Sequence, residues 1–201
     1  MKFMVLCGND KTGRKLLSII KDTNIILALD KSLSPKRILN LLKRGSIDIP
    51  FLLELMRAEA LRSDTKPFEA YSIRSNSELF NLINHLEVDV VIMFRVGLII
   101  SQKVIQSRAK VINVHCAKIP DYQGLGSIKR ALKNQDLDQE ATMYFITGKV
   151  DDGEIIATKN YRLTPEKRYG ENEDCAYDAG MQLILEQLAV WVKQEVLPIP
   201  N

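Results

Sequence analysis

What the chain has little of already excludes several classes of protein. It contains three cysteines in 201 residues, Cys7, Cys116 and Cys175, and none of them forms a CxxC pair. An odd number of widely separated cysteines fits neither a disulfide framework nor a cysteine-based zinc site, so we expect free thiols and no metal centre. The formal net charge is only +3. Charge therefore gives no reason to expect a nucleic-acid or membrane partner.

Long apolar runs are missing as well. No stretch approaches the roughly 20 apolar residues that a membrane span requires. The apolar start over residues 3–7 is too short for a signal peptide. We therefore expect a cytoplasmic protein. With 46% hydrophobic and 26% charged residues, the chain has the composition of a globular protein, and we expect one domain over residues 1–201.

Short apolar runs alternate with helical patterns along the whole chain. Strands are expected at residues 2–7, 24–29, 68–73, 88–94, 110–115, 141–147 and 154–163. This alternation is typical of an α/β fold, here a Rossmann-like, mostly parallel sheet with helices on both faces. The last two runs are separated only by the turn 148–153. They predict an antiparallel strand pair near the C-terminal part of the chain.

Capping residues mark several of the expected helices. Ser34 followed by Pro35 predicts a helix start, and Gly45 predicts its end. Ser75 and Glu78 have the spacing of a capping box. Further helices are expected at 49–62, lying over the sheet, and at 174–196, ended by Pro198 and Pro200. The charged segment 165–174 is interpreted as an exposed turn, with a lid or the contact of a homodimer as alternatives.

The polar end of one strand is the most informative place for function. Asn113 and His115 close the run 110–115, and side chains two apart on a strand point to the same face. In open α/β sheets ligands bind beyond the carboxyl ends of strands. Acyl transfer to an amine needs donors for a developing oxyanion, a group that moves protons and a carboxylate that charges it. Asn113, His115 and Asp151 are candidates, since a βαβ-type connection can return the turn with Asp151 to the same end of the sheet.

Other constellations are weaker. His85, the second histidine, has the position of a helix-end surface residue. Cys116 beside His115 resembles a nucleophile pair, but adjacent strand residues point to opposite faces. A metal site of His115, Cys116 and the aspartates at 151–152 lacks the usual ligand spacing. The glycine-flanked turn 8–13 could hold a phosphate, although it matches no phosphate-loop pattern, and a plain strand-to-helix turn is the alternative.

Two segments carry a resemblance to a known family. Residues 111–125 (VINVHCAKIPDYQGL) hold an Asn-x-His strand end followed by a proline and a glycine, and residues 142–147 and 150–156 (TMYFIT and VDDGEII) hold an apolar strand, an aspartate turn and a Gly-x-Ile-Ile strand. Together they resemble the tetrahydrofolate-dependent formyltransferases. The resemblance covers residues 88–160, and the first 80 residues match only in general layout.

The resemblance implies a reaction and a set of site residues. Asn113, His115 and Asp151 occupy the family's catalytic positions, and the implied co-substrate is N10-formyltetrahydrofolate. In the implied mechanism the Asn113 amide and a protonated His115 stabilise the oxyanion, while Asp151 keeps His115 charged and helps to remove the amine proton. The family's folate loops correspond to Phe94, Arg95, Val96, Gly97 and Leu98 and to Thr147, Gly148 and Val150.

Departures from the family pattern bear on the acceptor, a small-molecule amine. A serine that is common after the histidine is absent and Lys118 has entered that loop, and Asn9 to Thr12 replace the phosphate loop of glycinamide ribonucleotide formyltransferases. Asn9, Lys11 and Lys118 are therefore the candidate substrate-binding residues. The first interpretation of the acceptor is the amino group of a nucleotide-linked deoxyamino sugar. The alternatives are glycinamide ribonucleotide, then water in a formyltetrahydrofolate hydrolase, then a non-catalytic relative. Methionyl-tRNA is not expected, because its formyltransferases carry an additional domain.

Overall fold

The computed structural model describes residues 1–194. The strands are β1 (Phe3–Gly8), β2 (Ile26–Asp30), β3 (Tyr71–Ile73), β4 (Val90–Phe94), β5 (Lys110–His115), β6 (Asp138–Phe145) and β7 (Ile155–Arg162). The helices are α1 (Lys11–Ile20), α2 (Pro35–Lys43), α3 (Ile49–Leu61), α4 (Asn76–His85), α5 (Gln102–Ile105), α6 (Ser127–Lys133) and α7 (Tyr169–Gln194). The strand bounds differ from the expected ones by a few residues, as is usual for element ends.

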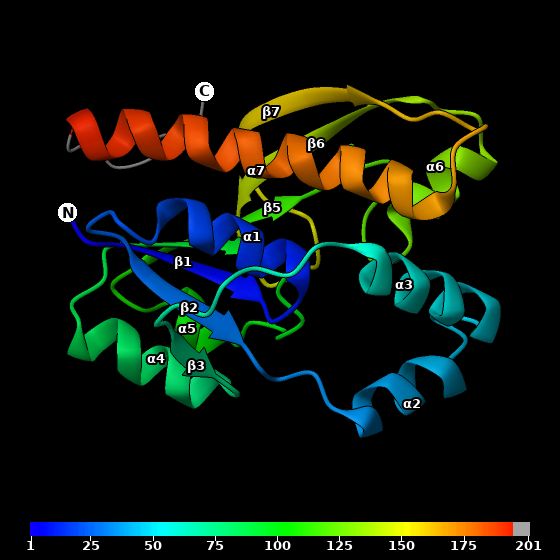
Figure 1. Cartoon of the computed structure of the whole chain (residues 1–201). Coiled ribbons are helices and arrows are strands. Elements are labelled where there is room, and N and C mark those ends of the chain that lie inside the picture. Colours follow the sequence, from blue (N-terminus) through cyan, green and yellow to red (C-terminus); the bar gives the residue numbers. More distant parts are fainter. Residues whose placement is uncertain (195–201) are drawn as a thin grey trace.

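The strands form one seven-stranded sheet in the order β3-β2-β1-β4-β5-β6-β7. The first five strands in this order are parallel, β6 is antiparallel to β5, and β7 is antiparallel to β6. Helices α1 and α7 lie on one face of the sheet, and α4 and α5 lie on the other (Figure 1). The predicted fold class is confirmed, including the antiparallel pair near the C-terminal part.

The two cores, one on each face of the sheet, explain why the sequences of the central strands are unbroken apolar runs. Val5 and Ile92 point toward the face of α1 and α7, whereas Met4 and Val91 point toward the face of α4 and α5. All four side chains are fully buried. A strand covered on both faces cannot alternate apolar with polar residues, because each side chain enters one of two cores.

The predicted caps are present. The Ser34 hydroxyl accepts the N–H of Arg37 at 3.3 Å, and the Ser75 hydroxyl accepts that of Glu78 at 3.2 Å. Gly45, past the end of α2, has a φ of 66°, which glycine adopts without strain. The Glu78 carboxylate accepts the N–H of Arg74 at 2.8 Å. The return bond of the capping box is thus made to the residue before the N-cap and not to the N-cap residue Ser75 itself.

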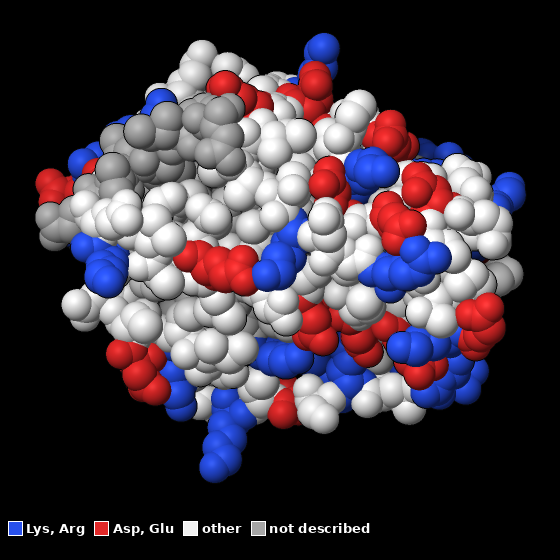
Figure 2. All heavy atoms as spheres, turned by 90° about the horizontal axis from the view of Figure 1, so that it is seen from above, with Lys and Arg blue, Asp and Glu red and all other residues white. Residues whose placement is uncertain are grey.

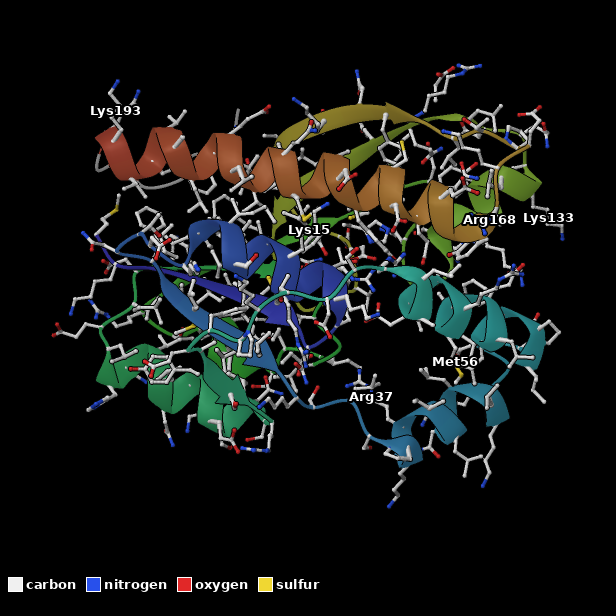
Figure 3. The ribbon with its side chains drawn as sticks, in the orientation of Figure 1. Lys15, Arg37, Met56, Lys133, Arg168 and Lys193 are labelled. Atoms are coloured by element: carbon white, nitrogen blue, oxygen red, sulfur yellow. The ribbon has the colours of Figure 1, made fainter. Side chains whose placement is uncertain are left out.

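The prediction that the helix at 49–62 covers the sheet is wrong. Helices α2 and α3 form a pair beyond the carboxyl edge of the sheet (Figure 1), and α3 packs against α7. The Phe51 ring meets the Tyr169 ring edge-on at 5.4 Å between centroids. Among the residues of α3 only Phe51 and Ala58 are buried, and Met56 lies between α3 and α2 with 60% of its surface exposed (Figure 3). An apolar composition alone could not show which surface this helix meets.

The last helix begins five residues earlier than predicted. Residues 169–174 form its first turns, and Asn172 and Glu173 are 1% and 2% exposed. The Asn172 side chain accepts the N–H of Thr164 at 2.7 Å, and Glu173 pairs with Arg62 at 2.9 Å. Because the nearby loop satisfies Asn172 and the distant Arg62 neutralises Glu173, both side chains are buried, and the interpretation of the whole 165–174 segment as an exposed turn is wrong. The predicted end of the helix at 196, with Pro198 and Pro200, lies outside the described residues.

Charges of both signs are mixed on the face that carries α7 (Figure 2), and no large area of that face has one sign. Lys15 of α1 points toward α7 (Figure 3), and its ammonium lies 3.0 Å from the Asp178 carboxylate. Within residues 1–194, no helix combines the length and the apolar character that crossing a membrane would take.

Candidate active site

Asn113 and His115 point to the same face of β5, as their spacing predicts. Their side chains are half-buried. Ile112, which precedes Asn113, and Val114, which lies between the two, are buried in the core on the opposite face. Because β1, β2, β4 and β5 are parallel, His115 stands at the edge of the sheet where all four strands end. A histidine and an amide are thus placed together at the edge where such folds bind ligands.

Asp151 reaches His115 by a route that differs from the predicted one. The connection from β5 to β6 is not of the βαβ type, since β6 is antiparallel to β5 and its last residue, Phe145, pairs with Ile112. The loop 146–154 therefore folds back to bring Asp151 to His115, with 3.5 Å between the Asp151 Oδ2 and His115 Nδ1 atoms. Gly153 allows this, because a Cβ at that position would lie 1.7 Å from the Phe145 carbonyl oxygen.

A tyrosine joins Asn113 to Asp151. The Asn113 amide nitrogen donates to the Tyr144 hydroxyl at 2.7 Å, and that hydroxyl donates to Asp151 Oδ1 at 2.5 Å. Tyr144 stands opposite Asn113 in the β5–β6 register and is 3% exposed. Burial, together with the adjacent Asp151 carboxylate, raises the pKa of the Tyr144 hydroxyl. The hydroxyl therefore keeps its proton, and the three side chains form one continuous hydrogen-bonded chain.

Both ring nitrogens of His115 face oxygen acceptors. Nε2 lies 2.8 Å from the Tyr122 carbonyl oxygen, and Nδ1 faces the Asp151 carboxylate. Only a ring that carries both protons can donate on both sides. The carbonyl fixes the orientation of the ring, while the longer Nδ1 contact leaves that edge available to a further acceptor.

The loop after β5 holds the aspartate loop from the other side. The N–H of Gly124 donates to Asp151 Oδ2, and the Gln123 side chain donates to the Asp151 carbonyl, both at 2.7 Å. Gly124 has a φ of 76°, a conformation that a side chain at this position would strain. Asp151, 8% exposed, is thus contacted by a tyrosine hydroxyl, a backbone N–H and an imidazole.

The two predicted folate loops lie near each other. Val96, Gly97 and Leu98 are half-buried after β4, and an added Cβ on Gly148 would lie 3.8 Å from the Gln102 side chain that follows this loop. Thr147, Gly148 and Val150 are exposed, and Val150 exposes 65% of its surface. In the first loop, Ile99, which follows Leu98, exposes 72% of its surface. Apolar side chains left exposed beside a polar cluster suit a flat ring with polar edges.

Asp30 fixes the first of these loops and was missed by the sequence analysis. Its carboxylate accepts the N–H of Gly97 at 2.6 Å, of Leu98 at 3.0 Å and of Ser32 at 2.8 Å. Asp30 ends β2 and is 4% exposed. The rule that singled out His115, a polar residue at the carboxyl end of a strand, also applies to Asp30.

Two of the residues assigned to the folate loops have other roles. Phe94 is fully buried in the core, 6.5 Å from the Tyr177 ring centroid, so its assignment to the ligand is corrected. Arg95 places its guanidinium 3.8 Å from the Tyr177 ring centroid and donates to Asp10 at 3.0 Å. The Arg95 side chain therefore links the ends of β1 and β4 to α7. It is thus committed to structural contacts, and the predicted folate loop is reduced to residues 96–98.

The turn after β1 is not a phosphate cradle. The N–H of Gly13 donates to Asp10 and that of Lys11 donates to Glu59, both at 2.8 Å, so carboxylates already occupy these donors. The Lys11 ammonium donates to the carbonyl oxygens of Ala60 and Arg62. Its assignment to the substrate is therefore replaced by a structural role at the end of α3.

The other two candidate substrate residues are placed differently. The Asn9 side chain accepts two hydrogen bonds from Arg14 on the exposed surface. Lys118 is half-buried in the loop that follows His115, and its N–H donates to the Gln139 side chain at 3.3 Å. Of the three, Lys118 is the one that shares a loop with the catalytic candidates.

The weaker candidates of the sequence analysis, Cys116, His85 and a metal site, are not part of this cluster. Cys116 is buried in the core opposite His115, and burial raises the pKa of its thiol to about 12, which removes it as a nucleophile. His85 is exposed at the end of α4, as predicted. In residues 1–194 no group of three or more His, Cys, Asp or Glu side chains is arranged to hold a metal ion.

Comparison with known proteins gives the family. A profile of the formyl transferase family matches residues 33–188, which is most of the chain. The chain belongs to this family. It is 26% identical over 200 residues to methionyl-tRNA formyltransferase from Dictyoglomus thermophilum, covering 98% of this chain and 61% of that protein. This chain thus spans about three fifths of the length of that curated relative, and 46% of the length of methionyl-tRNA formyltransferase from Bdellovibrio bacteriovorus.

Solved structures share the fold. Phosphoribosylglycinamide formyltransferase from Anaplasma phagocytophilum superposes with a TM-score of 0.70 at 13% identity, over 98% of this chain and 89% of that one. A sugar N-formyltransferase from a Shewanella species gives 0.62 at 15% identity, over 100% and 74%. The predicted family is confirmed.

Proposed function

We propose that this protein transfers a formyl group from N10-formyltetrahydrofolate to a primary amine, with Asn113, His115 and Asp151 as the catalytic residues. The observation that carries the proposal is their placement together at the carboxyl edge of the sheet: Asn113 is joined to Asp151 by hydrogen bonds through Tyr144, and Asp151 lies 3.5 Å from His115. The co-substrate supplies an activated formyl group when it is bound. The half-buried loop 96–98 and the exposed Val150 provide its binding surfaces, and Asp30 holds that loop in place.

Each catalytic residue has a task that follows from its contacts. The Asn113 amide has a second N–H beside the one given to Tyr144, and this N–H donates to the formyl oxygen. The Nδ1 edge of doubly protonated His115 donates to the same oxygen as negative charge develops on it. Asp151 keeps His115 charged and accepts the proton that the amine loses on attack. The bond between the formyl carbon and N10 then breaks, and this proton passes to N10 of the departing tetrahydrofolate.

The acceptor is proposed to be the amino group of a nucleotide-linked deoxyamino sugar. The turn after β1 disfavours glycinamide ribonucleotide, because its N–H donors are bound by Asp10 and Glu59 and two carboxylates repel a phosphate there. Lys118, in the loop after His115, is the proposed contact to the acceptor. The names of the curated relatives make methionyl-tRNA a necessary arm of the test.

The test is consumption of N10-formyltetrahydrofolate, followed by its absorbance change, with separate acceptors. The panel contains several amino-sugar nucleotides, glycinamide ribonucleotide, charged methionyl-tRNA and no acceptor. Turnover that requires one acceptor and disappears in Asp151→Asn supports the transferase and names its amine. Asp152→Asn is the matched control, since Asp152 is the neighbouring exposed aspartate.

Three results contradict parts of the proposal. Turnover at the same rate without acceptor indicates hydrolysis of the donor. Turnover with glycinamide ribonucleotide or methionyl-tRNA but with no amino sugar overturns the acceptor. Absence of donor consumption in every arm, together with absence of folate binding by calorimetry, overturns the proposed reaction and favours a non-catalytic family member.

A further inference from the structure

The hydrogen-bonded chain through Tyr144 has a direction. An ionised Asp151 can only accept, so the single proton of the Tyr144 hydroxyl must point to Oδ1, 2.5 Å away. The Tyr144 oxygen then has only lone pairs to offer to Asn113. The side chain of Asn113, 2.7 Å away, must therefore turn its NH₂ group, and not its carbonyl, toward the tyrosine.

This direction matters because an asparagine side chain can flip. The amide and carbonyl ends of Asn113 have nearly the same shape, and only the amide end donates to a formyl oxygen. A flipped side chain would present lone pairs to an oxygen on which negative charge develops. Tyr144, which is opposite Asn113 in the strand register and 3% exposed, is held too firmly by the sheet to follow such a flip.

We propose that Tyr144 is a positioning residue that uses the charge of Asp151 to fix the amide of Asn113 in its donating orientation. This inference rests on the proposed function for its catalytic consequence, whereas the orientation itself is a property of the free protein. The charge on one catalytic residue thereby sets the geometry of another, 38 positions away in the sequence, through a hydroxyl that touches no reacting atom.

The first arm of the test is kinetic and uses Tyr144→Phe, which keeps the ring and removes the hydroxyl. Removal of one oxyanion donor typically lowers kcat by about 100- to 1,000-fold, and loss of its orientation is expected to give a loss of about tenfold or more. The KM for N10-formyltetrahydrofolate should stay constant. Tyr161→Phe is the matched control, since it also removes a hydroxyl with one strong bond, 2.7 Å to the Cys116 carbonyl.

A double-mutant cycle separates orientation from general damage. If Tyr144 acts through Asn113, then Tyr144→Phe should lower kcat in the wild-type background but hardly at all in an Asn113→Ala background. Equal losses in the two backgrounds overturn the proposal, because they indicate an effect that does not pass through the amide. An unchanged kcat in the wild-type background overturns it too.

The second arm does not depend on activity. The side-chain amide of Asn113 is assigned by NMR of the ¹⁵N-labelled protein, using the signal lost in Asn113→Ala. Its protons should exchange slowly with solvent in the wild type and in Tyr161→Phe, and rapidly in Tyr144→Phe. Identical Asn113 signals in the wild type and Tyr144→Phe overturn the inference. If the wild type consumes no formyl donor, the proposed function fails while this arm still decides the orientation.

Asp151→Asn changes the other end of the hydrogen-bonded series Asn113–Tyr144–Asp151. This variant keeps the inference testable if Tyr144→Phe does not fold. An asparagine at this position can donate to Tyr144 as well as accept from it, so the direction of the chain is lost. The Asn113 amide signals are expected to shift and to exchange faster. Unshifted Asn113 signals in Asp151→Asn contradict a role for the Asp151 charge.

Discussion

Two loops leave the same edge of the sheet, one after β1 and one after β5, and they differ in what their polar groups contact. After β1, Asp10 and Lys11 bind backbone groups, Arg95 and the end of α3, so that each polar group has a structural partner. At the end of β5, His115 faces Asp151, which comes from the loop after β6, at 3.5 Å beside exposed apolar side chains. A position at the carboxyl edge is thus not sufficient for a catalytic role, since the partners decide it.

The difference also predicts how each region responds to substitution. Changes in the cluster of Asn113, His115 and Asp151 should lower activity with little effect on stability, because the sheet beneath it is complete without these side chains. Changes around the loop after β1 and the end of α3 should lower stability and spare the reaction. Asp10 pairs with Arg95 at the end of β4, Lys11 donates to the carbonyl of Arg62 at the end of α3, and Arg62 in turn pairs with Glu173 of α7.

The largest effect is expected at His115. His115→Gln removes the charged group that is proposed to donate to the formyl oxygen, and kcat should fall by about 100- to 10,000-fold. His85→Gln is the matched control, since the second histidine is exposed at the end of α4. Both variants should unfold at the wild-type temperature in a thermal melt. A similar loss in the two variants would remove His115 from its proposed role.

Breaking the buried ion pair between α3 and α7 is expected to affect stability instead. Arg62→Met leaves Glu173, whose side chain is 3% exposed, as an unpaired buried charge. The free energy of unfolding in urea should fall by about 3–5 kcal/mol. Arg57→Met on the exposed side of the same helix is the control. A loss of kcat in Arg62→Met without loss of stability would erase the contrast between the two loops.

A smaller effect is expected where Asp30 holds the loop 96–98, which is proposed to bind the folate. Asp30→Asn replaces a charged acceptor of three N–H groups by an amide with one acceptor oxygen. The KM for the formyl donor should rise about tenfold, since hydrogen bonds to charged groups contribute about 1.5–3 kcal/mol, while kcat stays constant. Asp22→Asn, on the exposed surface, should change neither constant. A fall in kcat with an unchanged KM would contradict the positioning of this loop.

The smallest effect is expected at Lys11. Lys11→Met removes the donor to two carbonyl oxygens at the end of α3 and should cost about 1 kcal/mol of stability. The KM for the amine acceptor should not change. In the matched variant Lys118→Met, the acceptor KM should rise, because Lys118 lies in the loop after His115. The reverse pattern would return Lys11 to the acceptor site.

Much of the fold follows from local patterns in the chain. The run from Val90 to Phe94 is apolar throughout and became a central strand covered on both faces. The caps at Ser34 and Ser75 needed only their neighbours three residues on. The start of α7 could not be predicted in this way, since the buried Glu173 pairs with Arg62, more than a hundred residues earlier.

The candidate site was predictable in part for the same reason. Asn113 and His115 share a face because they are two apart on one strand. Asp151 was a candidate as the acidic residue of a turn expected at the same end of the sheet, and the family resemblance supported it. The bridge through Tyr144 depends on the antiparallel register between β5 and β6, which no local pattern specifies. The assignment of Phe94 to the ligand failed because a residue at a strand end can point into the core as easily as out of it.

The sequence by itself determined the α/β fold, the family and the three chemical groups at the site, because periodicity, caps and motifs are carried by residues close together in the chain. Only the tertiary structure decided that Asp151 arrives by a folded-back loop, that Asp30 and Tyr144 support the site, and that Lys11 and Phe94 do not face it. These outcomes depend on contacts between distant segments, where the burial and pairing of a polar group are fixed by its partner.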